Sequence, residues 1–130
     1  MVKFAYTILY VQDVEKSVSF YEQAFGFQRK FVTPDNQYGE LAAGETTLSF
    51  AAVHLAQTNL SAGFIESSPK NKPFGMEIGF TTNDVQQVLD HAVHAGAVEV
   101  EKPKTKPWGQ VVAYMKDPDG FLIEICTPVS

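Results

Sequence analysis

Cysteine is nearly absent from this 130-residue chain: Cys126 is the only one, so no internal disulfide can form. No cationic side chain stands next to it in the sequence, so the pattern predicts a structural thiol. Long hydrophobic runs are missing as well, since none approaches the roughly 20 apolar residues that span a bilayer. The first residues show no signal-peptide pattern. We therefore expect a soluble, cytoplasmic protein with no membrane partner.

Positive charge is scarce. Ten Lys and Arg residues stand against fifteen Asp and Glu residues, which gives a formal net charge of -5. This balance lacks the basic surface that a nucleic-acid-binding protein needs, so we expect no nucleic-acid partner. Hydrophobic residues make up 45% of the chain, which is enough to build a core without disulfides, and the length predicts a single domain over residues 1–130.

The first half of the sequence predicts a strand, a helix and three further strands. Asp13 is typical of a helix N-cap and Gly26 of a helix C-terminus, and apolar residues recur at helical spacing between them. Runs of β-branched and aromatic residues separated by turn residues predict the strands. The expected helix covers residues 14–25, and the expected strands cover residues 3–11, 27–32, 37–43 and 46–53.

The second half repeats this order. Asp84 precedes a second apolar stripe that ends at Gly96, as Asp13 does in the first half. The expected helix lies near residues 84–95, and the expected strands cover residues 75–81, 98–101, 110–116 and 121–126. The chain thus divides into βαβββ modules near residues 3–53 and 75–127. Residues 54–74 between them show no sustained period, which predicts a loop that serves as a lid, an arm or a plain linker.

Strand alternation places two carboxylates on one face of the second module. In the last strand, Glu124 alternates with Ile123 and Ile125, and Glu77 alternates in the same way with apolar neighbours. The apolar set is expected to pack under the helices, which leaves Glu77 and Glu124 on the opposite, mixed face. Two converging carboxylates would attract a cationic ligand or a divalent ion, or they could simply be solvated.

Several motifs together resemble the vicinal oxygen chelate superfamily, which includes glyoxalase I, bleomycin-binding proteins and extradiol dioxygenases. They are the two βαβββ modules, the stretch Tyr10–Ser17 that leads into Phe20-Tyr21, Trp108-Gly109, and the closing Asp117-Pro118-Asp119-Gly120 with Ile123-Glu124. The resemblance covers residues 4–127. It implies an α+β fold in which the two modules form an open, curved, eight-stranded cup, and it implies pairing of two chains as a homodimer.

The same resemblance names the positions where enzymes of that superfamily hold a divalent metal. The matching residues here are Tyr6, Ser49, Glu77 and Glu124. A phenol and a hydroxyl are poor ligands for Zn, Ni or Mn, so the ligand set is incomplete and we expect no cofactor. If a metal does bind, Glu77 and Glu124 are the expected ligands.

Three functions remain open. The first is a metal-independent protein of the bleomycin-resistance type that binds a small molecule, cationic or aromatic and antibiotic-like. The second is a metal-dependent lyase or isomerase resembling glyoxalase I, and the third is a non-catalytic dimeric interaction module. No catalytic residue is assigned. His91 and His94, three residues apart on the second helix, are expected to be solvated. The expected ligand-binding residues are Tyr6, Ser49, Glu77, Trp108, Tyr114 and Glu124.

Overall fold

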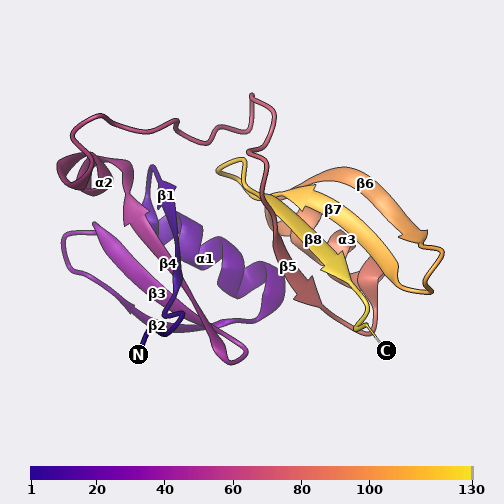
Figure 1. The fold of residues 1–130 in the computed structure, drawn as a ribbon. Coiled ribbons are helices and arrows are strands. Elements are labelled where there is room, and N and C mark those ends of the chain that lie inside the picture. Colours follow the sequence, from indigo (N-terminus) through magenta and orange to yellow (C-terminus); the bar gives the residue numbers. More distant parts are fainter. Residues whose placement is uncertain (130) are drawn as a thin grey trace. The chain divides into compact units, whose positions relative to one another are not determined.

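The computed structural model describes residues 1–129, and the chain folds as two compact units, Met1–Glu66 and the residues from Ser67 onward. Each unit holds one four-stranded open sheet with the order strand, helix, strand, strand, strand (Figure 1). The fold is therefore α+β and is built from two βαβββ modules, as the sequence predicted. No helix within residues 1–129 is long and apolar enough to cross a lipid bilayer.

The first module runs from β1 to α2. Its sheet has the order β1-β4-β3-β2, in which β1 and β4 are parallel and the other pairs are antiparallel. The helix α1 packs on one face, where Phe50 lies against Tyr21 with ring centroids 5.3 Å apart. The elements are β1 (Thr7–Val11), α1 (Val14–Phe25), β2 (Gln28–Val32), β3 (Tyr38–Ala43), β4 (Thr46–Ala52) and α2 (Val53–Asn59).

The second module repeats this arrangement. Its sheet has the order β5-β8-β7-β6, with β5 parallel to β8, and α3 packs against β6, β7 and β8. Leu89 of α3 and Met115, Ile123 and Ile125 of the sheet are fully buried, so this face carries the core. The elements are β5 (Ile78–Thr81), α3 (Val85–Ala95), β6 (Val98–Thr105), β7 (Val111–Lys116) and β8 (Leu122–Cys126).

Both long helices begin and end where the sequence predicted, because local chemistry fixes their ends. Asp13 accepts a hydrogen bond from the Lys16 amide at 3.2 Å, and Asp84 accepts one from the Gln87 amide at 3.1 Å. Each carboxylate thus satisfies an amide that would otherwise lack a partner in the first helical turn. At the other end of α1, Gly26 takes the left-handed conformation (φ 72°) that terminates the helix.

Four boundaries differ from the sequence prediction by three residues or more. β5 begins at Ile78 and not at residue 75, because β8 pairs only with Ile78–Thr81. β1 begins at Thr7 and not at residue 3, because β4 pairs only with Thr7–Val11. β6 continues beyond residue 101 to Thr105, and its Pro103 is tolerated because β6 is an edge strand. The predicted loop 54–74 begins with a helix, α2, which buries Val53 and Ala56. At seven residues, α2 is too short to show a helical period in the sequence.

Candidate functional site

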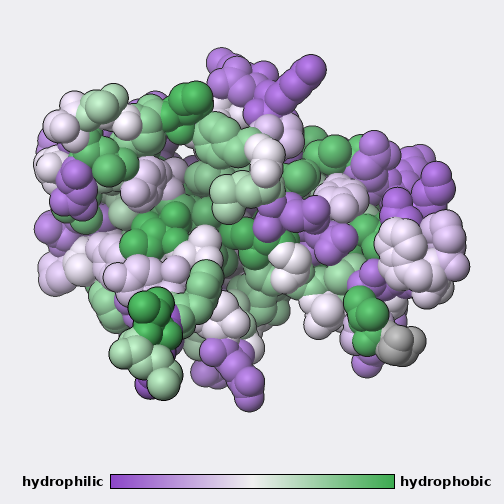
Figure 2. All heavy atoms as spheres, viewed as in Figure 1, coloured by the Kyte–Doolittle hydropathy of each residue, from purple (hydrophilic) through white to green (hydrophobic). Residues whose placement is uncertain are grey.

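The open face of the second sheet brings Tyr114 and Glu124 into contact. They are cross-strand partners on β7 and β8, and the Tyr114 hydroxyl donates a hydrogen bond to Glu124 Oε1 at 3.3 Å. Both side chains are half-buried. In Figure 1, β7 and β8 lie in front of α3, so the viewer looks onto the open face of the second sheet. Figure 2 has the same view and shows a mixture of hydrophilic and hydrophobic residues on this face. Tyr114 and Glu124 are therefore available to a ligand that reaches the open face.

Glu77 belongs to the same cluster. It lies one residue before β5, and Gly79, two residues further along, pairs with Glu124. Partial loss of hydration is the main cause that raises the pKa of the Glu77 carboxyl, and the charge of Glu124 raises it further. The Tyr114 hydroxyl acts in the opposite direction. The two carboxylates thus repel each other, with Glu77 exposed and Glu124 half-buried, and this repulsion favours a proton or an incoming cation.

Gly79 leaves the space that the Glu124 carboxylate occupies. A Cβ atom at this position would lie 3.3 Å from Glu124 Oε2, which is closer than most such contacts. The missing side chain therefore lets a carboxylate lie directly over β5. The sequence analysis did not single out Gly79, although its place in the alternation with Glu77 put it on the same face.

The surroundings of this cluster disfavour other ionised groups. Burial raises the pKa of the Tyr114 hydroxyl to about 12, and the charges of Glu77 and Glu124 contribute to the shift. Burial also raises the pKa of the Cys126 thiol, and Glu124 acts in the same direction. At neutral pH Tyr114 is a hydrogen-bond donor and Cys126 is a neutral thiol. Because both groups stay protonated, neither is activated as a nucleophile.

Trp108 is placed on the rim of the second sheet. It is 67% exposed, and its indole N–H donates to Gln110 Oε1 at 2.8 Å. The Gln110 amide in turn donates to the Thr127 carbonyl at 2.8 Å. Trp108 is thus anchored through its polar edge while its ring stays open to solvent. These hydrogen bonds do not connect Trp108 to Glu124 or Tyr114. The ligand-binding role of Trp108 stays a prediction.

The two predicted residues of the first module lie in different surroundings. Tyr6 is just outside β1 and is 48% exposed. Ser49 is in the middle of β4 and is fully buried, and its hydroxyl has no hydrogen-bond partner within residues 1–129. Across the sheet Ser49 pairs with Glu40 of β3. The Tyr38 hydroxyl donates to Glu40 Oε2 at 2.8 Å.

Glu40 was missed in the sequence analysis, although strand alternation could have found it. It alternates with the buried Gly39 and Leu41, as Glu124 alternates with buried Ile123 and Ile125. The open face of each module therefore holds one tyrosine hydroxyl bonded to one glutamate. In the first module both partners lie on β3, whereas in the second they lie on neighbouring strands.

The donor atoms do not fit a transition metal. Neither module, within residues 1–129, has a group of three His, Cys, Asp or Glu side chains that could hold a metal ion. Tyr6 and Ser49 supply a phenol and a buried hydroxyl where stronger ligands would be needed. Glu77 and Glu124 alone provide two carboxylates, which suit a hard cation or an organic cation better than Zn or Ni.

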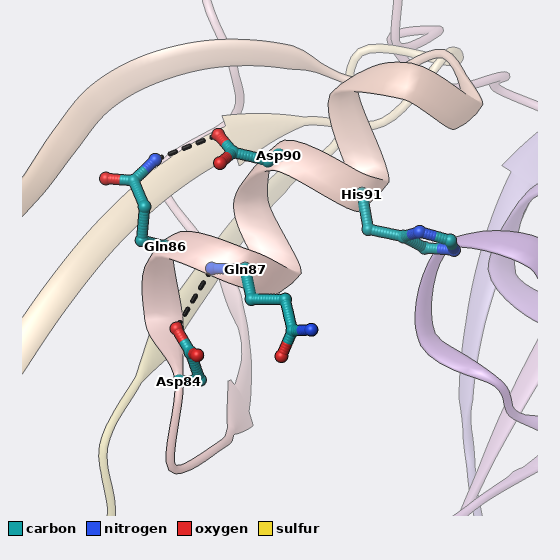
Figure 3. A pocket seen from close by; sticks show the side chains of 5 residues that line it. All are labelled: Asp84, Gln86, Gln87, Asp90 and His91. Carbon is teal, nitrogen blue, oxygen red and sulfur yellow. Dashed lines mark hydrogen bonds between the residues drawn. The ribbon is translucent and has the colours of Figure 1, made fainter.

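A hollow lies on α3, away from the open face of the sheet. Its volume is about 530 Å³, and Figure 3 shows its lining. Gln86 donates to Asp90 at 2.9 Å, and Asp84 is the helix N-cap. The His91 side chain extends away from the Gln86 and Asp90 pair (Figure 3). Three of the five lining side chains, those of Asp84, Gln86 and Asp90, are thus bonded within the helix, which disfavours the hollow as the functional site. It is lined by Asp84, Gln86, Gln87, Asp90 and His91.

Comparison with known protein families gives one match that covers almost the whole chain. The family described as the glyoxalase/bleomycin resistance protein/dioxygenase superfamily matches residues 3–125. A solved structure of a member of this family from Burkholderia phytofirmans superposes with a TM-score of 0.83 at 24% identity, covering 99% of this chain and 100% of that chain. A glyoxalase-related enzyme from Fulvimarina pelagi superposes with a TM-score of 0.81 at 21% identity, covering 98% and 89%.

Two relatives with similar sequences carry lyase names. A protein of Vibrio cholerae named "Probable lactoylglutathione lyase" is 29% identical, covering 92% of this chain and 86% of that protein. A lactoylglutathione lyase of Arabidopsis thaliana is 27% identical over 95% of this chain. The chain spans 43% of the length of that plant relative.

Proposed function

Because the chain belongs to the glyoxalase/bleomycin resistance protein/dioxygenase superfamily, we propose that it is a metal-independent member that binds a small molecule with a cationic group. The Glu124 carboxylate, bonded to the Tyr114 hydroxyl beside a Glu77 of raised pKa, carries this proposal. An ammonium or guanidinium group would relieve the repulsion between the two carboxylates and would form charge-assisted hydrogen bonds with them.

The other predicted residues support a ligand with a flat apolar part. The ring of Trp108 is open to solvent, and the half-buried ring of Tyr114 lies on the open face with Glu124. Aromatic rings offer a stacking surface, and cations are favoured over their faces. A cationic aromatic compound combines both features. Binding and sequestration of such a compound requires no nucleophile, which agrees with the neutral Cys126 and Tyr114.

The test compares charged and neutral forms of one ligand. A thermal-shift screen of aromatic amines identifies a compound that stabilises the protein, since a ligand of the native state raises its melting temperature. Calorimetric titration then compares wild type with Glu77→Gln and Glu124→Gln. We expect each variant to bind the amine about 1 to 3 kcal/mol more weakly, which is the contribution of one charge-assisted hydrogen bond.

A matched control separates this effect from a general loss of negative charge. Glu45 is exposed in the turn between β3 and β4, and Glu45→Gln removes the same charge. We expect this variant to bind the amine as wild type does. The neutral alcohol analogue should bind all four proteins alike. Equal affinity of the amine for wild type, Glu77→Gln and Glu124→Gln would overturn the proposal.

The second candidate is a lyase, and the names of the relatives favour it. That reading requires a metal on an incomplete ligand set, with Glu77 and Glu124 as its ligands. Elemental analysis of protein purified without chelator separates the two candidates. We expect far less than one Zn, Ni, Mn or Fe per chain, because Tyr6 and Ser49 replace stronger ligands. About one metal per chain, with lactoylglutathione lyase activity, would replace our proposal with this one.

A further inference from the structure

The first module has a polar cluster of its own on the open face of its sheet. It consists of Tyr38, Glu40 and Ser49, and we call it the β3–β4 cluster. Leu48 and Phe50, the neighbours of Ser49 along β4, are buried on the α1 side of the sheet. Because successive side chains of a strand point to opposite faces, Ser49 points to the open face, as its cross-strand partner Glu40 does.

Ser49 is the unusual member of this cluster. Its hydroxyl is fully buried and lacks a hydrogen-bond partner among the protein atoms of residues 1–129. Buried polar groups are nearly always paired, so an exception calls for a physical explanation. Burial raises the pKa of the Tyr38 phenol, and Ser49 lies close enough to this hydroxyl to act in the opposite direction. Tyr38 itself donates its proton to Glu40 at 2.8 Å.

We propose that the β3–β4 cluster is a second cation subsite, in which the Tyr38 hydroxyl moves between two acceptors. Without ligand, Tyr38 donates to Glu40. When a primary ammonium group binds Glu40, Tyr38 turns its hydroxyl to Ser49 Oγ. No covalent bond changes and no proton leaves the protein. The inference rests on the proposed function for its ligand class, but it uses residues of the other module.

The exchange has a simple energetic reason. A carboxylate that accepts a phenol hydrogen bond at one oxygen is already partly satisfied, and an ammonium group competes with this bond. If the displaced hydroxyl found no new acceptor, binding would leave a half-buried donor unpaired. Ser49 provides that acceptor and is itself paired in the process. The Ser49 hydroxyl is unpaired in the free protein and paired in the complex, and this gain of a hydrogen bond favours binding.

The experiment follows Tyr38 directly. Benzylamine, which is a cation at neutral pH, is titrated into protein carrying ¹³Cζ-labelled tyrosine, and Tyr38→Phe assigns the Tyr38 resonance. We expect benzylamine to shift this resonance in wild type and in Glu45→Gln, and to leave it unshifted in Glu40→Gln. Benzyl alcohol, the neutral analogue, should leave it unshifted in all proteins. Ser49→Ala should weaken benzylamine binding at this subsite about fivefold, the effect of one ordinary hydrogen bond.

Coupling between the variants distinguishes the exchange from a purely structural role of Ser49. In a Tyr38→Phe background, Ser49→Ala should have no further effect on binding, because the moving hydroxyl is gone. In the free protein, Ser49→Ala should leave the fold equally or more stable, because the buried hydroxyl that it removes is unpaired there. Additive effects of the two substitutions, or a Tyr38 resonance that benzylamine does not shift, would overturn the inference.

The same titration separates this inference from the proposed function. Loss of binding in Glu77→Gln and Glu124→Gln with unchanged binding in Glu40→Gln would refute the β3–β4 cluster as a subsite and keep the proposed function. Loss in Glu40→Gln alone would keep the subsite and refute the site around Glu124. A wild-type protein that binds no benzylamine at Tyr38 would refute the inference outright.

Discussion

Single side chains in this protein acquire their chemistry from the residue opposite them on the sheet. Glu124 lies opposite Tyr114 on β7 and beside Gly79 on β5, so it meets a hydroxyl on one side and open space on the other. Glu40 lies opposite Ser49, which gives it a buried hydroxyl as neighbour. Two glutamates on equivalent open faces therefore have different neighbours.

The pKa of Glu77 tests the contact with Glu124. In Glu124→Gln we expect the Glu77 pKa to fall, because the neighbouring negative charge is gone, but to stay above its usual value because desolvation is the larger cause. A carboxyl with a raised pKa in the fold binds its proton more tightly there than in the unfolded chain. Stability from this group is therefore present at low pH and is lost as the pH rises through the folded pKa.

The measurement is an NMR pH titration of the Glu77 side chain in wild type and in the Glu124→Gln variant. Glu77→Gln removes the unfavourable charge, so its free energy of unfolding at neutral pH should equal or exceed that of wild type, by no more than about 0.5 kcal/mol for such an exposed position. A Glu77 pKa that is the same with and without the Glu124 charge would contradict the contact.

At the scale of elements, a short turn organises one end of the second sheet, where its two central strands meet. The turn between β7 and β8 is built on buried Asp117, whose Oδ1 accepts the amides of Asp119 and Phe121, both at 2.9 Å. The segment that precedes β5 packs against this turn. Ser67 donates to the Asp119 carbonyl at 2.9 Å, and Lys116 donates to the Asn71 carbonyl at 2.8 Å.

Gly120 makes this packing possible, and its replacement tests it. Gly120 has a positive φ of 95°, and a Cβ atom there would lie 2.5 Å from the Ser68 carbonyl group. We expect Gly120→Ala to reduce the free energy of unfolding by more than about 2 kcal/mol, because backbone strain and a backbone clash add. Urea denaturation monitored by circular dichroism measures this loss.

A matched control isolates the clash. Gly44 also has a positive φ, 66°, but nothing lies within 4 Å of a Cβ atom added there. Gly44→Ala should therefore cost only about 1 kcal/mol, the effect of backbone conformation alone. Similar losses of unfolding free energy in the two variants would contradict the clash. They would show that the segment before β5 can move away from a side chain at Gly120 at little cost.

At the scale of the whole molecule, both sheets are open and leave strands at their edges. β1 and β2 are the edges of the first sheet, and β5 and β6 are the edges of the second. Large apolar side chains are also exposed, including Phe4, Ile65 and Trp108. Open edges and exposed apolar side chains favour association, and closed two-fold pairs are the commonest soluble assembly. We propose a homodimer.

Light scattering coupled to size exclusion tests this at micromolar concentration. We expect a mass near twice the 14.4 kDa of one chain. Substituting exposed apolar residues by charged ones, as in Phe4→Glu, should shift the mass towards one chain if the residue lies in the contact. A mass of one chain for wild type at this concentration would refute the homodimer.

The sequence by itself determined the order of the strands and of the two long helices, and it determined which residues share a face of a sheet. Asp caps, terminal glycines and strand alternation are local signals. They predicted the helices α1 and α3, and they predicted that Glu124 lies on the mixed face of its sheet. The family resemblance rested on similarly local motifs, such as Asp117 to Gly120. These features depend on covalent neighbours and on the periods of helix and strand, which a sequence displays directly.

Only the tertiary structure decided which side chains meet across strands. The register between β3 and β4 put Glu40 beside Ser49, and the register between β7 and β8 put Tyr114 within 3.3 Å of Glu124. The start of β1, the extension of β6 and the presence of α2 depended in the same way on partner strands and on burial. A strand partner lies far away in the sequence, and hydrogen bonds, desolvation and charge coupling act through space, so local patterns do not encode them.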